Sequence, residues 1–334
     1  MKVFKKILKV SIFVFLTLLA LLLVLSVRKN PETIFYGASF SKLRSDELGL
    51  DWEKVYMAVL DDLGVRKLRL SAHWPMVEPE RDNFNFSELD FQIREAEKRE
   101  VGVILSIGRR LPDWPECHVP GWAKSLSWEE QKERILLVIE KLVTRYKNYE
   151  NLQYWQVENE PFLEIFAKEH CGDLDQDFLK KEIDLVKRLD PKHPILVTDS
   201  GNLGLWYGAW RSGDAFGTSV YMYLWNPELG QIKSVYLPSF YKLKTNLMTL
   251  LFGKKESLLI ELSLEPWLIA PALDNPIEVQ IDRMSLDKFE EVIVFARKTG
   301  FVEQYLWGAE WWYWMKGRGH GEYWERAKIL FQSQ

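Results

Sequence analysis

Two carboxylates at the ends of separate apolar segments are the residues of this chain best suited to do chemistry. Glu160 ends the segment Trp155–Pro161 as part of the pair Asn159–Glu160, and Glu261 directly follows the apolar run Leu258–Ile260. Charged side chains are seldom buried unless they are paired or needed for a reaction. Two carboxyl groups at strand ends can supply the acid and base for bond cleavage. The pattern therefore favours glycoside hydrolysis.

Glu261 is predicted to be the nucleophile because the sequence offers it two suitable donors. In hydrolysis with retention, one carboxylic acid protonates the leaving oxygen while a carboxylate about 5–5.5 Å away attacks the anomeric carbon. The attacking group must be kept ionised by a cation or by hydrogen-bond donors. Arg69 and Tyr221 are the expected donors. Glu265 takes the nucleophile's place instead if its strand runs further than the apolar run indicates.

Other polar residues near the expected strand ends have alternative roles. Glu158 is expected to anchor the barrel interior or a loop, and His73 is either a sugar ligand or a capped polar residue. The five histidines are scattered along the chain, so no cluster has the spacing of metal ligands and no metal or other cofactor is expected. Among the 15 tryptophans, Trp307 is predicted to stack on a sugar ring, and most others are expected to pack loops.

The elements that must hold these residues alternate between apolar strands and amphipathic helices, which is typical of parallel strands joined by helices. Eight strands are expected to begin near Thr33, Val65, Val101, Leu152, Pro194, Ala215, Ser257 and Phe301. Helices are expected over 51–63, from a capping box at Ser127, over 178–189 and over 285–298. The segment 201–214 has little helical periodicity. We therefore expect an α/β fold, a (β/α)8 TIM barrel with one abbreviated unit, whose reactive groups lie at the carboxyl ends of the strands.

The N-terminal residues predict a membrane anchor. Four lysines precede an uncharged stretch of 18 residues, Val10–Val27. As a helix, this stretch is roughly 27 Å long, close to the hydrocarbon thickness of about 30 Å. The lysines predict a cytoplasmic N-terminus and an extracytoplasmic remainder; a cleaved signal, and hence a secreted protein, is the alternative. We expect residues 1–29 to be a cytoplasmic stub and signal anchor with one transmembrane helix, and residues 30–334 to be the barrel.

Charge and cysteine content narrow the range of partners. The first 29 residues hold six of the 44 basic residues and no acidic ones, leaving 38 basic against 48 acidic residues, a net charge of −10. An acidic domain of this kind is a poor binder of nucleic acid. Cys117 and Cys171 both lie in expected loops. In an oxidising compartment they could form one disulfide, or they could be two unrelated thiols.

The residues in this order resemble the retaining (β/α)8 glycoside hydrolases of clan A, which include the family 5 cellulases and mannanases. The resemblance runs from Tyr36 to the last expected strand and rests on Arg69, Asn159-Glu160-Pro161, Tyr221, Glu261 and Trp307. It implies that Glu160 is the acid/base and Glu261 the nucleophile. It also implies that Asn159 binds the sugar 2-hydroxyl and that Tyr221 and Arg69 support the nucleophile.

Two positions depart from that family pattern. Arg109-Arg110 stands where family 5 members commonly have a histidine, and Ser219 stands where a second histidine is often found. The paired arginines suggest a substrate with an acidic sugar. The alternative is that they form salt bridges to Glu158 or Asp199.

Three functions are compatible with the sequence. The leading hypothesis is a membrane-anchored retaining β-glycosidase that cleaves an extracytoplasmic polysaccharide or glycoconjugate by double displacement. A non-catalytic glycan-binding barrel is the second, and two buried carboxylates count against it because they cost desolvation free energy. A transglycosylase that uses the same residues is the third. In all three the partner is a carbohydrate.

Overall fold

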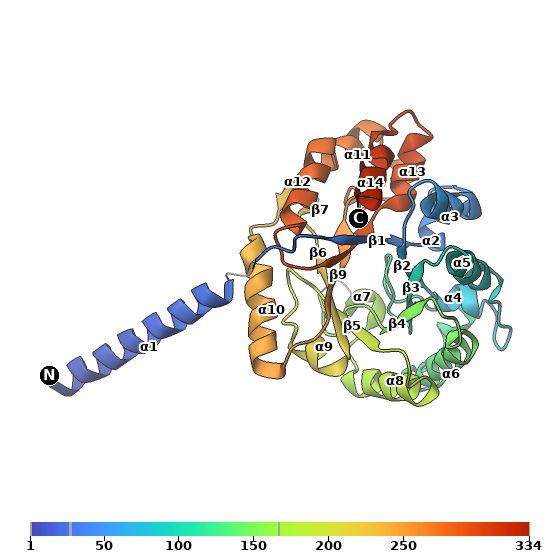
Figure 1. The fold of residues 1–334 in the computed structure, drawn as a ribbon. Helices are drawn as coiled ribbons and strands as arrows, with labels where there is room; N and C mark the ends of the chain where they lie inside the picture. The colour runs from blue at the N-terminus through green and yellow to red at the C-terminus, as the bar shows by residue number, and fades with distance from the viewer. Residues whose placement is uncertain (1, 27–28, 166–167, 334) are drawn as a thin grey trace.

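The computed structural model describes residues 2–26, 29–165 and 168–333, and it contains a barrel with a separate N-terminal helix (Figure 1). Within these residues, eight parallel strands close in the order β1-β10-β9-β6-β5-β4-β3-β2. Their bounds are β1 Phe35–Phe40, β2 Lys67–Ser71, β3 Gly102–Ile107, β4 Leu152–Val157, β5 Ile195–Asp199, β6 Ala215–Val220, β9 Ser257–Ser263 and β10 Glu303–Trp307. Each begins within two residues of its expected start, so the predicted barrel is confirmed.

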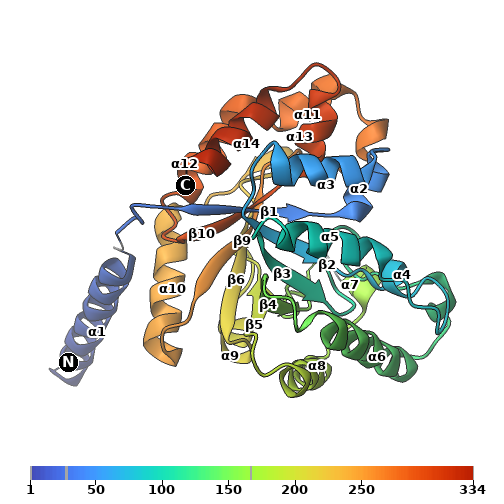
Figure 2. The ribbon, with the colours of Figure 1, turned by 45° about the vertical axis from the view of Figure 1, so that its right-hand side comes forward.

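Helices surround the barrel on its outside (Figures 1 and 2). They are α2 Lys42–Glu47, α3 Trp52–Asp61, α4 Trp74–Val77, α5 Ser87–Glu97, α6 Trp128–Tyr146, α7 Lys168–Cys171, α8 Gln176–Leu189, α9 Tyr207–Ser212, α10 Pro238–Phe252, α11 Ile277–Arg283, α12 Leu286–Ala296, α13 Ala309–Lys316 and α14 Glu322–Gln332. Short 3₁₀ turns occur at Gly121–Ala123 and Ala272–Asp274. The expected helices correspond to α3, α6, α8 and α12.

Local sequence signals explain where these helices begin. At the start of α6, the Ser127 side chain accepts from the Glu130 amide and the Glu130 carboxylate accepts from the Ser127 amide, which is the predicted capping box. Asp51 caps α3 and Ser285 caps α12 in the same way through their side-chain oxygens. The segment 201–214 forms only the six-residue helix α9. The abbreviated unit is therefore confirmed.

The strands separate two apolar regions. In β3, Val103, Leu105 and Ile107 pack against the surrounding helices, whereas Ile104 belongs to a smaller cluster with residues from five other strands. Because side chains alternate along a strand, one set fills the barrel and the other binds the helices. Leu258, Ile260 and Tyr305 fill the barrel beside Ile104. This packing fixes the strand ends that carry the polar residues.

An antiparallel hairpin was not expected from the sequence. It consists of β7 Tyr223–Asn226 and β8 Gly230–Lys233, between β6 and α10. Gly230 has a φ of 72°, which is readily available to glycine in a tight turn. Each strand has only four residues. Strands this short carry too little alternation for a sequence pattern to reveal them.

The N-terminal helix α1 covers Lys2–Ser26, contacts α10 and extends away from the barrel (Figure 1). No helix in the described part of the chain is both long and apolar enough to cross a membrane. The expected transmembrane helix is therefore not supported. Residues 27–28, at the end of the predicted anchor, lie outside the described residues, and the division of the chain at residue 29 stays a prediction.

Candidate active site

Glu261 lies in the strand β9, and its carboxylate is held by two donors from other strands. Arg69 Nη1 in β2 donates to Glu261 Oε2 at 2.6 Å, and the Tyr221 hydroxyl after β6 donates to Oε1. The Glu261 side chain keeps 10% of its surface exposed while that of Arg69 keeps 1%. A cation and a hydroxyl donor both favour the ionised carboxylate. The structure thus places Arg69 and Tyr221 on Glu261, as the sequence predicts.

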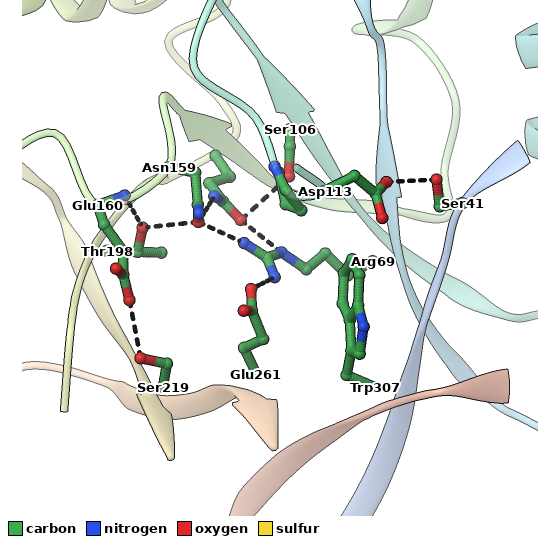
Figure 3. Close-up of polar contacts among 12 residues, drawn as sticks. Ser41, Arg69, Ser106, Asp113, Asn159, Glu160, Thr198, Ser219, Glu261 and Trp307 are labelled. Atoms are coloured by element: carbon green, nitrogen blue, oxygen red, sulfur yellow. Dashed lines mark hydrogen bonds and ion pairs between the residues drawn. The ribbon is translucent and has the colours of Figure 1, made fainter. Parts of the chain in front are cut away.

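Arg69 is also the centre of a buried polar network (Figure 3). Its Nη2 donates to Asn159 Oδ1 at 2.8 Å, and its Nε donates to Gln156 Oε1 at 2.8 Å. Ser106 Oγ donates to the same Gln156 oxygen at 3.0 Å. Each guanidinium edge therefore has a fixed acceptor, which orients both the arginine and Asn159. Sequence reasoning missed Gln156, although an amide in the middle of a buried strand is the signal that could have revealed it.

Glu160 lies just after β4, with its carboxyl group close to Glu261 (Figure 3). Ser219 Oγ donates to Glu160 Oε1 at 2.7 Å, and the Glu160 amide donates to Thr198 Oγ1 at 2.8 Å. The residue keeps part of its surface accessible, yet protein atoms surround the carboxyl group. Burial and then the charge of Glu261 raise its pKa to about 8. A carboxyl that holds its proton near neutral pH is suited to general acid catalysis.

Glu158 secures a loop, which is one of the two roles expected for it. Its Oε1 accepts from the Arg109 amide at 2.7 Å, and its Oε2 accepts from the Arg110 amide at 2.5 Å. Gly108 precedes these amides with a φ of 120°, and a Cβ there would lie 2.3 Å from Glu158 Oε1. Glu182 is a buried neighbour of Glu158, and its pKa is raised by burial and by the charge of Glu158. Glu158 thus joins the loop after β3 to the loop after β4.

The two arginines of that loop are not placed as a binding site for an acidic sugar. Arg109 donates to the Cys171 carbonyl oxygen at 2.7 Å, and its guanidinium lies 4.3 Å from the Trp128 ring centre. Arg110 donates through Nε to Glu116 Oε2 at 2.6 Å. Both guanidinium groups are occupied by protein partners. The expected substrate contact of Arg109 is therefore not supported, and the salt bridge of Arg110 is to Glu116 rather than to Glu158 or Asp199.

His73 lies in a buried polar group at the edge of the site. Its Nε2 is 3.0 Å from the Pro112 carbonyl oxygen, and its ring centre is 4.3 Å from that of His118. Burial lowers the pKa of His73 to about 4 and is also the first cause that lowers the pKa of His118 to about 4. Both rings are thus neutral at pH 7. Of the two roles expected for His73, the structure favours the capped polar residue.

Asp113 and Ser41 were not singled out in the sequence, yet they lie beside the predicted residues (Figure 3). Ser41 Oγ donates to Asp113 Oδ2, and the Ser41 amide donates to Glu310 Oε1 at 2.6 Å. Burial raises the pKa of Asp113 to about 6 and that of Glu310 to about 8. Asp113 comes from the loop after β3, whose path the sequence does not specify.

Trp307 rises from the end of β10 next to Arg69 (Figure 3). Its Nε1 donates to Glu265 Oε1 at 3.1 Å, and Arg44 Nη2 donates to the same oxygen at 3.2 Å. Arg44 and Trp307 thereby hold Oε1 of Glu265, while its Oε2 is buried without a hydrogen-bond partner. This arrangement favours Glu261 over Glu265 as the nucleophile, and it leaves the stacking role of Trp307 a prediction.

A disulfide joins Cys117 to Cys171, with an S–S distance of 2.04 Å. It connects the loop after β3 to the helix α7 after β4, so the bridge between neighbouring loops is confirmed as the better of the two alternatives. In the described part of the chain, no group of three or more His, Cys, Asp or Glu side chains could hold a metal ion.

Comparisons with known proteins address the fold. No family model matches the chain. The GH5_18 protein from Bifidobacterium longum subsp. longum ATCC 55813 superposes with a TM-score of 0.58 and 11% identity, covering 83% of this chain and 70% of that one. Xylanase 10B from Thermotoga petrophila RKU-1, solved with xylobiose, gives 0.52 and 16% identity over 82% of each chain.

A β-galactosidase from Bacillus circulans sp. alkalophilus gives a TM-score of 0.51 and 13% identity, covering 83% of this chain but 51% of that one. This chain therefore spans about half the length of that enzyme. Identities this low establish a shared fold only. The chain is similar in fold to family 5 and other glycoside hydrolase barrels, and the expected (β/α)8 architecture is confirmed.

Proposed function

We propose that this protein is a retaining β-glycoside hydrolase that acts by double displacement. The observation that carries the proposal is the pairing of a carboxyl with a raised pKa, Glu160, and a carboxylate held by Arg69 and Tyr221, Glu261, at one end of one barrel. Two carboxyl groups in opposite protonation states are the equipment that hydrolysis with retention needs. The solved structures with the same fold carry names of xylanases and galactosidases, which supports the same class of reaction.

In the first step, Glu261 attacks the anomeric carbon while Glu160 donates its proton to the leaving glycosidic oxygen. Ser219 holds Glu160 Oε1, and Arg69 with Tyr221 holds both oxygens of Glu261, so neither group must reorganise during the reaction. In the second step, ionised Glu160 takes a proton from water, which then attacks the glycosyl-enzyme bond. Glu261 leaves as a carboxylate, and the product keeps the configuration of the substrate.

Asn159 is proposed to bind the sugar 2-hydroxyl. Its Oδ1 accepts from Arg69 at 2.8 Å, which leaves its amide NH₂ free to face the site only as a donor. An amide NH₂ can only donate hydrogen bonds, so the sugar hydroxyl that it meets must accept through an oxygen lone pair. Contacts to the 2-hydroxyl that strengthen in the transition state contribute several kcal/mol in such enzymes. Trp307 is proposed to provide the apolar surface for the same sugar.

The substrate is proposed to be a neutral β-glycoside in a polysaccharide or glycoconjugate. Arg109 and Arg110 are occupied by the Cys171 carbonyl and by Glu116, so they give no support to an acidic sugar. Asp113, Glu116 and Glu265 add further carboxyl groups around the catalytic pair, and these disfavour a substrate carboxylate by charge repulsion. Comparing neutral with uronic-acid oligosaccharides tests this: a preference for uronic acids contradicts it.

The test of the reaction is turnover of a panel of aryl β-glycosides with the anomer of the first product read by NMR. The expected result is release of the β-anomer, with turnover lost in Glu160→Gln and Glu261→Gln. Release of the α-anomer contradicts a double displacement. Glycan binding without turnover, unchanged in both variants, establishes the non-catalytic alternative instead.

The catalytic barrel is further proposed to work outside the cytoplasm. The Cys117–Cys171 disulfide supports this location, because disulfides persist in oxidising compartments and are rare in the cytosol. Alkylation of unreduced protein in intact cells should modify neither cysteine, and modification of both would place the barrel in a reducing compartment. Retention by the N-terminal segment, rather than release after cleavage, is tested by sequencing the N-terminus of the mature chain.

A further inference from the structure

One side of the barrel combines exposed apolar residues with an unusual charge. The stretch from Leu229 to Lys255 contains five lysines and no acidic residue, in a domain whose net charge from residue 30 onward is −10. It includes the whole of α10. The neighbouring stretch from Gly201 to Gly213 likewise has one basic and no acidic residue. A local positive region on an acidic domain indicates an anionic partner.

Large apolar side chains are exposed in the same place. We define the α9–α10 face by its exposed apolar residues and two exposed cations: Leu203, Leu205, Tyr207, Leu250, Leu251, Phe252, Arg211 and Lys254. Leu205 is 84% exposed, and Leu250 and Leu251 are 60% and 57% exposed. Single exposed leucines are ordinary, whereas a group of this kind marks an interaction site.

Contacts between α9 and α10 show that these residues form one continuous face. The rings of Tyr207 and Phe252 are 5.3 Å apart, and Trp210 Nε1 donates to the Gly253 carbonyl oxygen at 3.3 Å. Lys244 in α10 donates to the Gly204 carbonyl oxygen at 2.7 Å, which fixes the leucine-bearing segment 201–205 to the helix. The face is therefore preformed and needs no rearrangement to bind.

The N-terminal helix contacts α10, the helix that carries part of this face. Lys242 Nζ in α10 donates to Asn30 Oδ1 at 2.7 Å just after α1 (Figure 2). Along α1, Phe13, Phe15 and Val24 are 71%, 64% and 69% exposed. Apolar surface flanked by lysine and arginine is what peripheral proteins place in the headgroup region of a bilayer. A second protein would also need apolar contacts, but the positive charge and the contact of the apolar helix α1 with α10 favour lipid.

We propose that the α9–α10 face rests on an anionic lipid surface beside α1. The leucines and Phe252 enter the headgroup boundary, while Arg211 and Lys254 pair with lipid phosphates. The strand arrows in Figure 2 point away from α1, so a barrel bound in this way opens its catalytic end away from the lipid. The proposal asks of α1 only that it contact the surface. It does not depend on the proposed hydrolysis.

The test is co-sedimentation of the full chain with phosphatidylcholine vesicles, with and without phosphatidylglycerol. The wild type should bind the anionic vesicles more tightly. Arg211→Glu with Lys254→Glu should lower that affinity about tenfold or more, since each basic residue near an anionic surface contributes about a factor of five. On vesicles of phosphatidylcholine alone, the same variant should match the wild type.

The matched control is Lys98→Glu with Lys141→Glu, which makes the same change of charge just after α5 and within α6, across the barrel from α10 (Figure 1). Its affinity for anionic vesicles should be within about twofold of that of the wild type, because Lys98 and Lys141 lie far from the lipid surface in the proposed orientation. Leu250→Ser with Leu251→Ser should weaken binding to both kinds of vesicle. Thermal unfolding confirms that each variant is folded.

Equal binding by the face and control variants overturns the proposal, as does a wild type with no preference for anionic vesicles. A face variant with unchanged lipid binding but an altered oligomeric state would assign the surface to contact between protein copies, and this also overturns it. Because α1 is intact in every variant, its own affinity for lipid cancels in these comparisons.

Discussion

Glu158 and Glu160 leave the same strand end two residues apart, yet they lie in opposite environments. Both have a positive φ, 58° and 45°, so the backbone after β4 turns sharply at each of them. Glu158 accepts from the backbone amides of Arg109 and Arg110 and serves the structure of the loops. Glu160 faces Ser219 and the charge of Glu261. The role of a buried carboxyl thus depends on what its oxygens face, and proximity in sequence does not determine it.

The same contrast separates Glu261 from Glu265. Arg69 and Tyr221 hold the Glu261 carboxylate at the barrel mouth, whereas Arg44 and Trp307 occupy Glu265 at its rim. Glu261 is bonded on both oxygens by donors that favour its ionised form, whereas Glu265 is bonded on Oε1 alone, by residues of the rim. Substitutions at matched positions can therefore separate reaction chemistry from structure.

The largest effect is expected for Glu261→Gln. Removing a covalent nucleophile should lower kcat/KM on aryl β-glycosides by about 10⁴-fold or more. The control is Glu265→Gln, which keeps the size of the side chain and should lower activity far less. Steady-state kinetics of the two variants decide the assignment, and the reverse order would transfer the nucleophile's role to Glu265.

Glu160→Gln should lower kcat/KM by about 10²–10⁴-fold on substrates with poor leaving groups. The loss should shrink for dinitrophenyl glycosides, because an activated leaving group needs less help from an acid. Glu158→Gln should instead lower the unfolding temperature. Any change that it causes in kcat/KM should be the same factor for all leaving groups. A leaving-group dependence in Glu158→Gln would break the comparison between the two residues.

The pH profile of kcat/KM should sharpen the assignment of the acid. Burial and the Glu261 charge raise the pKa of Glu160 to about 8, far above its ordinary value of 4.5. The protonated form is the active one for the first step, so activity should persist below pH 8 and fall as the pH rises through that value. In Glu160→Gln this alkaline decline should be absent. A wild-type activity that already falls as the pH rises through about 5 would contradict a protonated Glu160.

Tyr221→Phe should have an intermediate effect. A hydrogen bond to a charged group contributes about 1.5–3 kcal/mol, which corresponds to a loss of about 10–100-fold in kcat/KM if the bond is fully formed in the transition state. Tyr223→Phe is the matched control, because its hydroxyl bonds Glu291 on the outside of the barrel. Equal activity in the two variants would show that Tyr221 does not support Glu261 in the reaction.

The smallest effect on activity is expected for Cys117→Ser with Cys171→Ser. The disulfide closes a loop of 54 residues between the two chain positions, so its loss should lower the free energy of unfolding by about 2–4 kcal/mol. Turnover at a temperature well below unfolding should change by about twofold or less. Denaturant unfolding and turnover are the two measurements, and a large loss of turnover without a loss of stability would contradict this structural role.

Much of the barrel could be predicted because strand and helix periods are local. All eight strands coincide with apolar runs of the sequence, and the capping box at Ser127 marks the start of α6. Arg69, Tyr221 and Glu261 could be assembled because parallel strands bring their carboxyl ends to one side. The Glu160–Ser219 contact follows from the same geometry, although its partner is a serine rather than the histidine of the family pattern.

The errors lie in loops and in single side-chain directions. Arg109 follows β3 at a strand end, yet the chain turns at Gly108 and directs its guanidinium onto Trp128. Asp113 and Glu116 come from a loop whose path depends on a distant disulfide partner, Cys171. A local pattern contains no information on such long-range contacts. The hairpin β7–β8 was missed for the related reason that its strands are very short.

The most direct measurement is trapping of the glycosyl-enzyme with a panel of activated 2-deoxy-2-fluoro-β-glycosides, followed by mass-spectrometric mapping of the labelled peptide. The account predicts one covalent label per chain, attached to Glu261, with the reactive sugar naming the preferred substrate. Glu160→Gln should still be labelled, since an activated fluoride leaves without an acid. A label on Glu265 or on Glu160 itself would contradict the central claim that Glu160 and Glu261 act together as acid and nucleophile.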